Sequence, residues 1–170
     1  MTSTLNDLAE LVSNQAKNEL ANHYAYKTLE TNAENLGFLG LASFCASQAK
    51  GEIEHSDKIF SFLNDRGIKP PKNEIPLIVN NPVFEFLEII QSVIFIEDKT
   101  TAEINKILAL ASSCQDFLAF SFFLDLAKEQ IEEEKIIGDI LQGYIRRAST
   151  GDPASAIFDI DHWIGEVYGA

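Results

Sequence analysis

The sequence of 170 residues contains little cysteine, little basic charge and no long apolar run. Its two cysteines, Cys45 and Cys114, form no Cys-x-x-Cys spacing, which argues against a disulfide framework or a thiolate metal site. No stretch approaches the roughly 20 uncharged residues that span a bilayer, and residues 1–10 lack the basic start and apolar run of a secretion signal. We therefore expect a cytoplasmic protein with no membrane partner.

Basic side chains are scarce, since 13 Lys and Arg accompany 26 Asp and Glu and the net charge is −13. Binding to a phosphate backbone needs clustered Lys and Arg, so we expect no nucleic-acid partner. The acidity fits either ordinary solubility or attraction of cations, and overall charge does not separate these interpretations. The apolar fraction of 46% is enough for one continuous core, so we expect a single domain over residues 1–170.

Glycine and proline divide the first half of the chain into two predicted helices and a link. Gly37 ends a first helix that starts near residue 5, and Gly67 ends a second helix that starts near residue 41. The segment from Gly67 to Pro82 contains four prolines, which rule out a continuing helix and predict an extended crossover.

Three more helices are predicted after the crossover. We expect the third from Pro82 to about Ser112, the fourth from about Gln115 to Arg147, and a short fifth helix over about 153–168. Four long helices with two short turns and one long crossover predict an all-α four-helix bundle with a single crossing connection over about 5–147. Helical cytokines need two crossovers and ordinary up-and-down bundles need none, so the single link narrows the choice.

Polar side chains interrupt the apolar stripe of every long helix on a helical wheel. They are Glu19 in the first helix, Glu52 and His55 in the second, Glu97 in the third, and Gln130 and Glu133 in the fourth. Each alone could be a hydrogen-bonded core residue. Together, if uncompensated, they would cost more than the roughly 5–15 kcal/mol by which a domain is stable.

No Lys or Arg lies at the matching level of these stripes, so we expect metal ions to supply the positive charge. Four carboxylates, an imidazole and an amide form an oxygen-rich site that favours iron or manganese over a closed thiolate zinc site. Glu52 and His55 are three residues apart and can share a metal ion, and Gln130 and Glu133 repeat that spacing.

The chain resembles the bacterial non-haem ferritins over nearly its whole length, including the crossover and the fifth helix. Four segments match their ferroxidase signature in order and spacing: Glu19-x6-Tyr26, Glu52-x-x-His55, Glu97 and Glu129-Gln130-x-Glu132-Glu133-Glu134. The resemblance implies a di-iron centre between the helices.

The resemblance also implies a role for each residue, as follows: Glu19 and His55 hold a first iron, Glu52 bridges, and Glu97 with Gln130 or Glu133 holds a second. Tyr26 resembles the tyrosine that lends an electron during oxygen reduction. An alternative for Tyr26 is a core tyrosine whose hydroxyl is hydrogen-bonded.

Bacterial ferritins often carry a third iron position, and Glu129, Glu132 and Glu133 resemble three of its ligands. The family usually has a second acid directly before the bridging glutamate, where this chain has Gly51. We therefore expect a weaker or absent third site, and Glu129 and Glu132 could instead form a solvated acidic face. Haem-binding bacterioferritins have a methionine where this chain has Ile53, so no haem is expected.

The resemblance implies iron storage and detoxification, in which O2 or H2O2 oxidises Fe(II) to Fe(III) and ferric mineral collects in a homo-oligomeric shell of twenty-four subunits. Asp116 resembles an acid that lines the pores of that shell, although an acid there equally serves the helix dipole.

The fifth helix is expected to place Ile157, Ile160, Ile164 and Val167 on one apolar face. This face needs a partner chain, or else packs across the end of the bundle. Two alternative functions stay open. One is a di-iron oxidase or peroxidase of the same superfamily that stores no mineral, and the other is an inactive structural shell subunit.

Overall fold

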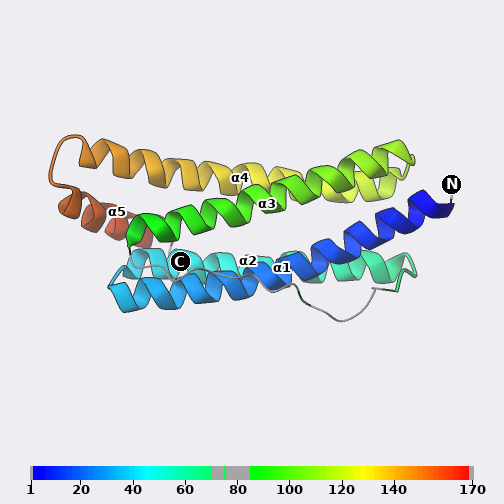
Figure 1. Cartoon of the computed structure of the whole chain (residues 1–170), viewed down its shortest axis with the longest axis horizontal. Helices are drawn as coiled ribbons and strands as arrows, with labels where there is room; N and C mark the ends of the chain where they lie inside the picture. The colour runs from blue at the N-terminus through cyan, green and yellow to red at the C-terminus, as the bar shows by residue number, and fades with distance from the viewer. Residues whose placement is uncertain (1, 70–74, 76–84, 169–170) are drawn as a thin grey trace.

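The computed structural model describes residues 2–69, 75 and 85–168, which form five α-helices and no strand. They are α1 (Thr2–Leu36), α2 (Leu39–Asp65), α3 (Phe86–Ser113), α4 (Phe117–Ala148) and α5 (Pro153–Tyr168). The first four lie side by side as a long bundle, and α5 lies at one end between α4 and α2 (Figure 1). The predicted fold class is confirmed. Among the described helices, none combines the length and hydrophobicity that a bilayer-spanning segment requires.

The long helices pair as α1 with α2 and α3 with α4, and each pair is joined by a short turn. The end of α2 and the start of α3 lie at opposite ends of the bundle (Figure 1), so these two helices run parallel. The predicted crossover lies largely outside the described residues, as does Pro82, the predicted start of the third helix. That start is wrong, because Glu85 is extended and forms a capping box with Glu88, so α3 begins at Phe86.

Left-handed glycines end the first two helices as predicted. Gly37 has φ 83°, and this backbone conformation lets the Phe38 N–H donate to the Ala33 carbonyl at 2.9 Å. Gly67 has φ 65° and allows the same bond from Ile68 at the end of α2. Both are Schellman motifs, which satisfy carbonyl groups that a helix end would otherwise leave unpaired.

The turn before α4 uses the same motif without glycine. Gln115 has φ 59°, and the Asp116 N–H donates to the Ala111 carbonyl at 2.9 Å. The prediction that the fourth helix starts at Gln115 is wrong by two residues, because the motif occupies Gln115 and Asp116 becomes the N-cap of α4.

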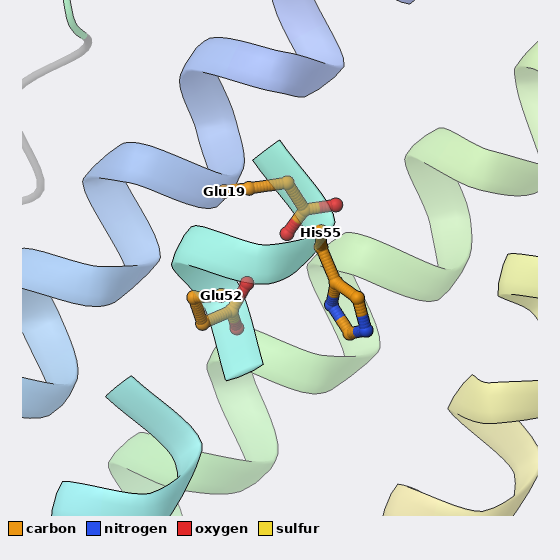
Figure 2. A group of neighbouring side chains, drawn as sticks. All are labelled: Glu19, Glu52 and His55. Carbon is orange, nitrogen blue, oxygen red and sulfur yellow. The ribbon is translucent and has the colours of Figure 1, made fainter. Parts of the chain in front are cut away.

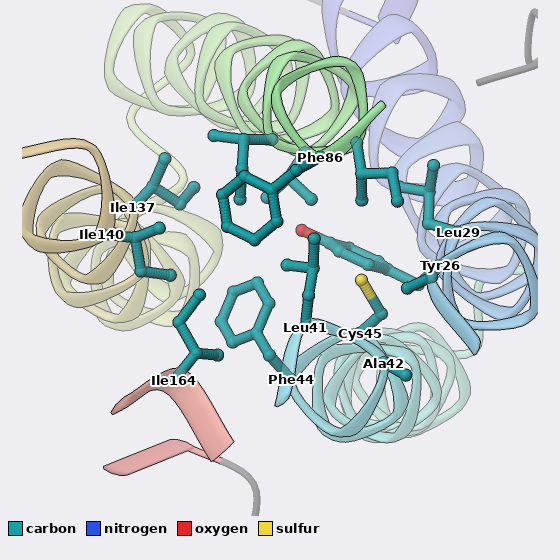
Figure 3. Packing of buried hydrophobic residues seen from close by; sticks show 14 of the residues in the cluster. Tyr26, Leu29, Leu41, Ala42, Phe44, Cys45, Phe86, Ile137, Ile140 and Ile164 are labelled. Carbon is teal, nitrogen blue, oxygen red and sulfur yellow. The ribbon is translucent and has the colours of Figure 1, made fainter. Parts of the chain in front are cut away.

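A polar layer crosses the bundle and divides its core into two apolar clusters. One cluster includes Tyr26, Leu29, Leu41, Phe44, Phe86, Ile137, Ile140 and Ile164 (Figure 3). The other includes Leu8, Val12, Ile59, Leu63, Ile104, Phe123 and Leu126. The buried residues between them along the helices form the polar layer: Glu19, Asn22, Glu52, Ser56, Glu97, Thr100 and Gln130. Every long helix therefore passes from one cluster to the other through this layer.

The apolar face of α5 is covered within the chain. Ile160 and Ile164 are fully buried in the first cluster, where Figure 3 shows Ile164 pointing into the core, and Ile157 packs against it. The expectation that this face needs a partner chain is wrong, since α2 and α4 supply the contacts. Val167 does not share the buried face, because it lies in the last turn and is 50% exposed.

The start of α2 is held by α5. Its N-cap, Phe38, makes no side-chain capping bond, and the Asp161 carboxylate instead accepts from the N–H groups of Gly40 at 3.2 Å and Leu41 at 2.8 Å. A negative charge at a helix N-terminus also interacts favourably with the helix dipole. The two backbones touch, since a Cβ on Gly40 would lie 1.8 Å from the Asp161 carbonyl oxygen.

Asp116 caps α4 and pairs with Arg66 after α2. Its carboxylate accepts from the Ala119 N–H at 3.1 Å and lies 2.7 Å from Arg66 Nη2, and its side chain is only 7% exposed. The hydrogen bond from Arg66 is the main cause that holds the pKa of Asp116 below its usual value. The pore role of Asp116 stays a prediction.

We predict that Gly40→Ala destabilises the protein by about 1–3 kcal/mol or more, because the added methyl group overlaps the α5 backbone. Urea denaturation would measure this change. Gly51→Ala is the matched control within α2, since its Cβ would meet nothing within 4 Å. Alanine there should stabilise the helix by about 0.5–1 kcal/mol. Equal effects of the two substitutions would contradict the backbone contact.

We predict that Asp116→Asn costs about 1 kcal/mol at pH 7 and progressively less as the pH falls below the usual pKa of an aspartate. Asparagine still caps a helix, so the substitution removes mainly the charge that pairs with Arg66. Because the folded pKa of Asp116 is lowered, its contribution is present above its usual pKa and is lost as the pH falls through the folded value. A difference between the urea midpoints of the two proteins that stays constant from pH 7 to pH 3 would rule this account out.

Candidate metal centre

Three predicted ligands meet between α1 and α2. Glu19 comes from the middle of α1, and Glu52 and His55 come from one turn of α2 (Figure 2). One ligand atom of each lies within 4.8 Å of the others. Glu19 and Glu52 are 1% and 5% exposed, and the His55 side chain is 11% exposed. Among the described residues, no other group of three or more acidic, histidine or cysteine side chains has its ligand atoms within 4.8 Å of one another.

The other predicted ligands meet across α3 and α4. Gln130 Nε2 donates to Glu97 Oε2 at 2.5 Å, and Glu133 shares a hydrogen bond with Glu97. Tyr26, from α1, donates its hydroxyl hydrogen to Glu97 Oε1. This group and the first interact, since the charge on Glu97 acts on Glu52. All six predicted ligands therefore lie in one region of the bundle, and ligation itself stays a prediction.

Three buried residues of the centre were not predicted. Gln15 Nε2 donates to Glu19 Oε1 at 2.8 Å, and Asn22 Nδ2 donates to Thr100 Oγ1 at 3.0 Å and lies 3.5 Å from Glu19 Oε2. The signal was present in the sequence, because Gln15 and Asn22 lie four residues before and three after Glu19 and so share its helix face. These amides orient the Glu19 carboxylate from both sides.

Burial dominates the electrostatics of the acids. It raises the pKa of Glu52 well above its usual value, with further increases from Glu19 and from the other nearby carboxylates. Burial also raises the pKa of Glu97, despite opposing hydrogen bonds from Tyr26 and Gln130. It raises the pKa of Glu133 to about 9, assisted by the charge on Glu97. At neutral pH the centre therefore holds protons as well as carboxylates.

Glu52 and Glu133 are the acids most favoured to hold a proton when no metal ion is bound. Burial raises the pKa of each above its usual value, and nearby carboxylates raise it further. Protons therefore supply part of the neutralising charge that the sequence analysis assigned to metal ions alone. Metal ions must displace the protons in order to bind.

The donors fit a divalent cation such as Fe(II). Glu52 Oε2 is buried without a hydrogen-bond partner, and so is Gln15 Oε1. A buried oxygen without a partner is rare in proteins and is consistent with a site for an ion. Carboxylate oxygens with one imidazole are typical ligands of iron and manganese.

The residues of the predicted third site are arranged differently. Glu129 hydrogen-bonds to His55 Nε2 at 2.9 Å and to Lys58 Nζ at 3.0 Å, and Glu132 lies exposed on α4. At Gly51 a Cβ would meet nothing within 4 Å, so the space of a second acid is open.

Comparison with known proteins agrees with this geometry. The family model for the ferritin-like domain matches residues 9–146. A probable bacterial non-haem ferritin-like protein of Haemophilus influenzae is 26% identical over 95% of both chains. A bacterial non-haem ferritin of Staphylococcus haemolyticus is 29% identical over 75% of this chain and 76% of its own. The open-pore ferritin of Archaeoglobus fulgidus superposes with a TM-score of 0.83 at 22% identity, covering 93% of this chain and 95% of its own.

We predict that Glu52→Gln makes the metal-free protein more stable by about 1–3 kcal/mol at pH 8, because it removes a buried acid with an unpaired oxygen. The folded pKa of Glu52 is raised, so the original protein loses stability as the pH rises above the usual carboxyl value, and the variant lacks the Glu52 part of that loss. Thermal unfolding in chelator from pH 5 to pH 8 measures the difference. Glu54→Gln, on the exposed face of α2, is the control, and a Glu52→Gln protein less stable at every pH would refute the prediction.

Proposed function

This chain belongs to the ferritin-like domain family, and from that premise we propose that it is a ferroxidase that stores iron. It would bind two Fe(II) ions in the polar layer and oxidise them to Fe(III) with O2 or H2O2. The ferric product would collect as mineral inside a homo-oligomeric shell. We take residues 1–170 as one ferritin-like domain of a cytoplasmic protein.

One observation carries this proposal. Glu19, Glu52 and His55 converge within 4.8 Å between the two apolar clusters of the core, and Glu52 Oε2 is buried without a partner. In a buried hydrogen-bond network that only stabilised the fold, that oxygen would be expected to have a hydrogen-bond partner. Family membership independently supports iron as the ion.

Binding of the substrate ions would replace protons with metal charge. Burial raises the pKa of Glu52, and Glu19 of the first ligand group and Glu97 of the second raise it further. Glu52 would lose its proton and bridge the ions. Glu19 and His55 would hold one ion, and Glu97 with Gln130 or Glu133 would hold the other. Two ferrous ions give one electron each, which suits an acceptor that takes electrons in pairs.

Tyr26 is placed to support the redox step. Its hydroxyl donates to Glu97, and burial followed by the charge on Glu97 raises its pKa well above the usual value. The phenol therefore keeps its proton at neutral pH. If Tyr26 gives an electron to the oxidant, its proton can pass directly to the Glu97 carboxylate.

The shell assembly is supported by large apolar side chains on the surface. They come from all five helices, and each is at least 66% exposed: Tyr24, Leu39, Phe95, Phe117, Leu118, Ile131 and Phe158. Exposed aromatic and aliphatic groups of this size favour contact with other copies of the chain. We propose the shell of twenty-four subunits that the resemblance implies. The apolar face of α5 adds no support for it, because that face is covered within the chain.

We also propose that the centre binds two ions per chain, without a tight third ion and without haem. Gly51 removes one acid of the third site, and Ile53 stands where bacterioferritins have methionine. A non-storing oxidase or peroxidase of the same superfamily and an inactive shell subunit are the alternatives.

We predict that Glu52→Ala abolishes fast aerobic oxidation of Fe(II), because the variant loses the carboxylate shared by both ions. Absorbance of the ferric product after mixing Fe(II) with air-saturated protein measures the rate. Glu54→Ala removes an exposed acid two residues away on α2 and should keep the original rate. Equal initial rates in the original protein and Glu52→Ala would exclude the ferroxidase, and equal loss in both variants would point to bulk charge instead.

We predict that the purified protein elutes as a particle with the mass of twenty-four chains and retains many more iron atoms than its binding sites hold. Light scattering coupled to size-exclusion chromatography measures the mass, and iron analysis of the loaded particle measures the content. A small oligomer with fast oxidation would favour the oxidase or peroxidase. A large particle without oxidation would favour the inactive shell subunit.

A further inference from the structure

The Glu129 carboxylate lies between His55 and the ammonium group of Lys58. Lys58 Nζ is 3.1 Å from Oε1 and 3.0 Å from Oε2 of Glu129, and His55 Nε2 is 2.9 Å from Oε2. Both carboxylate oxygens therefore already accept hydrogen bonds. A metal ion that used Glu129 as a ligand would lie directly beside the Lys58 ammonium group or displace it.

The contact with Glu129 also selects the nitrogen of His55 that faces the centre. The Lys58 ammonium can only donate, so both oxygens of Glu129 accept from it, and Oε2 also lies 2.9 Å from His55 Nε2. With Nε2 engaged by Glu129, Nδ1 is the nitrogen of His55 left to bind a metal ion. A carboxylate that accepts from the far nitrogen of a histidine is a common way to orient a metal ligand.

The residues around Glu129 offer few other acids that could hold a third metal ion in place of the Lys58 ammonium group. Gly51 contributes no acid and leaves open space, and Glu132 lies on the exposed face of α4. The Lys58 and Glu129 side chains are 46% and 42% exposed, and partly exposed ion pairs contribute little to stability. The pair therefore matters through the position it gives to His55, and its removal should leave the fold intact.

We propose that the Lys58 ammonium takes the place of a third metal ion in this centre, and that Glu129 is a positioning residue for His55. The inference rests on the proposed function, because it takes Glu19, Glu52 and His55 as metal ligands. It adds a second reason for two ions per chain, since a third divalent ion would meet a fixed positive charge beside its own ligand.

Calorimetric titration of the assembled, metal-free protein with Co(II) tests the role of Lys58. Co(II) occupies nitrogen and oxygen sites like those of Fe(II) and reports binding without oxidation of iron. We expect two ions per chain in the original protein and in Gly51→Glu, and three in the double variant Gly51→Glu with Lys58→Met. The matched control, Gly51→Glu with Lys58→Arg, keeps the charge and should stay at two.

Two outcomes would overturn the role of Lys58 while leaving the proposed function in place. One is a tight third ion in Gly51→Glu alone or in the arginine control, and the other is a double variant with Lys58→Met that still binds only two ions. An original protein that binds no Co(II) would instead remove the proposed function and this inference together.

The positioning role of Glu129 has its own test with the same probe. Glu129→Ala should weaken Co(II) binding to the first two sites by about tenfold or more and alter the visible absorption of bound Co(II), because His55 loses its support. Glu132→Ala is the control and should change neither quantity. Unchanged affinity and spectrum in Glu129→Ala would show that Glu129 does not position His55.

Discussion

Acidic groups inside an apolar bundle must be neutralised, and the rest of this structure follows from that constraint. Glu19, Glu52 and Glu97 are each at most 5% exposed. Protons and amide donors reduce the cost of their burial, and the raised pKa values of Glu52 and Glu97 reflect the cost that remains. The proposed binding of cations would relieve this destabilisation, and destabilised groups are typical of functional sites.

The polar layer affects the packing of the whole bundle. Because it crosses all four long helices, the two apolar clusters on either side must each stabilise part of the molecule. Long helices are needed so that each one reaches both clusters. The side chains around the ligands are held by the same arrangement, since Gln15, Asn22 and Ser56 bond to residues of α1 and α3.

Contacts with other helices anchor both ends of α2, the helix that carries Glu52 and His55. Its start is capped by Asp161 from α5 and its end lies beside the Arg66 and Asp116 pair that holds the start of α4. Glu52 and His55 lie between these two anchors. A third tie, from Lys58 through Glu129 to His55, links the middle of α2 to α4. The positions of these proposed ligands therefore depend on contacts far from the candidate metal centre as well as on their own helix turn.

The sequence by itself determined the five helices, the bundle class and the candidate ligands, because helix periodicity and breakers act locally and Glu19, Glu52, Glu97 and Gln130 interrupt apolar stripes. It also placed Gln15 and Asn22 on the helix face of Glu19, although neither was predicted to belong to the centre. Only the tertiary structure decided that α2 and α4 cover the apolar face of α5, that Asp161 caps α2, and that Lys58 hydrogen-bonds to Glu129. The contacts of Asp161 with α2 and of Lys58 with Glu129 each join residues more than 70 positions apart. All three depend on how the helices pack, which no local pattern specifies.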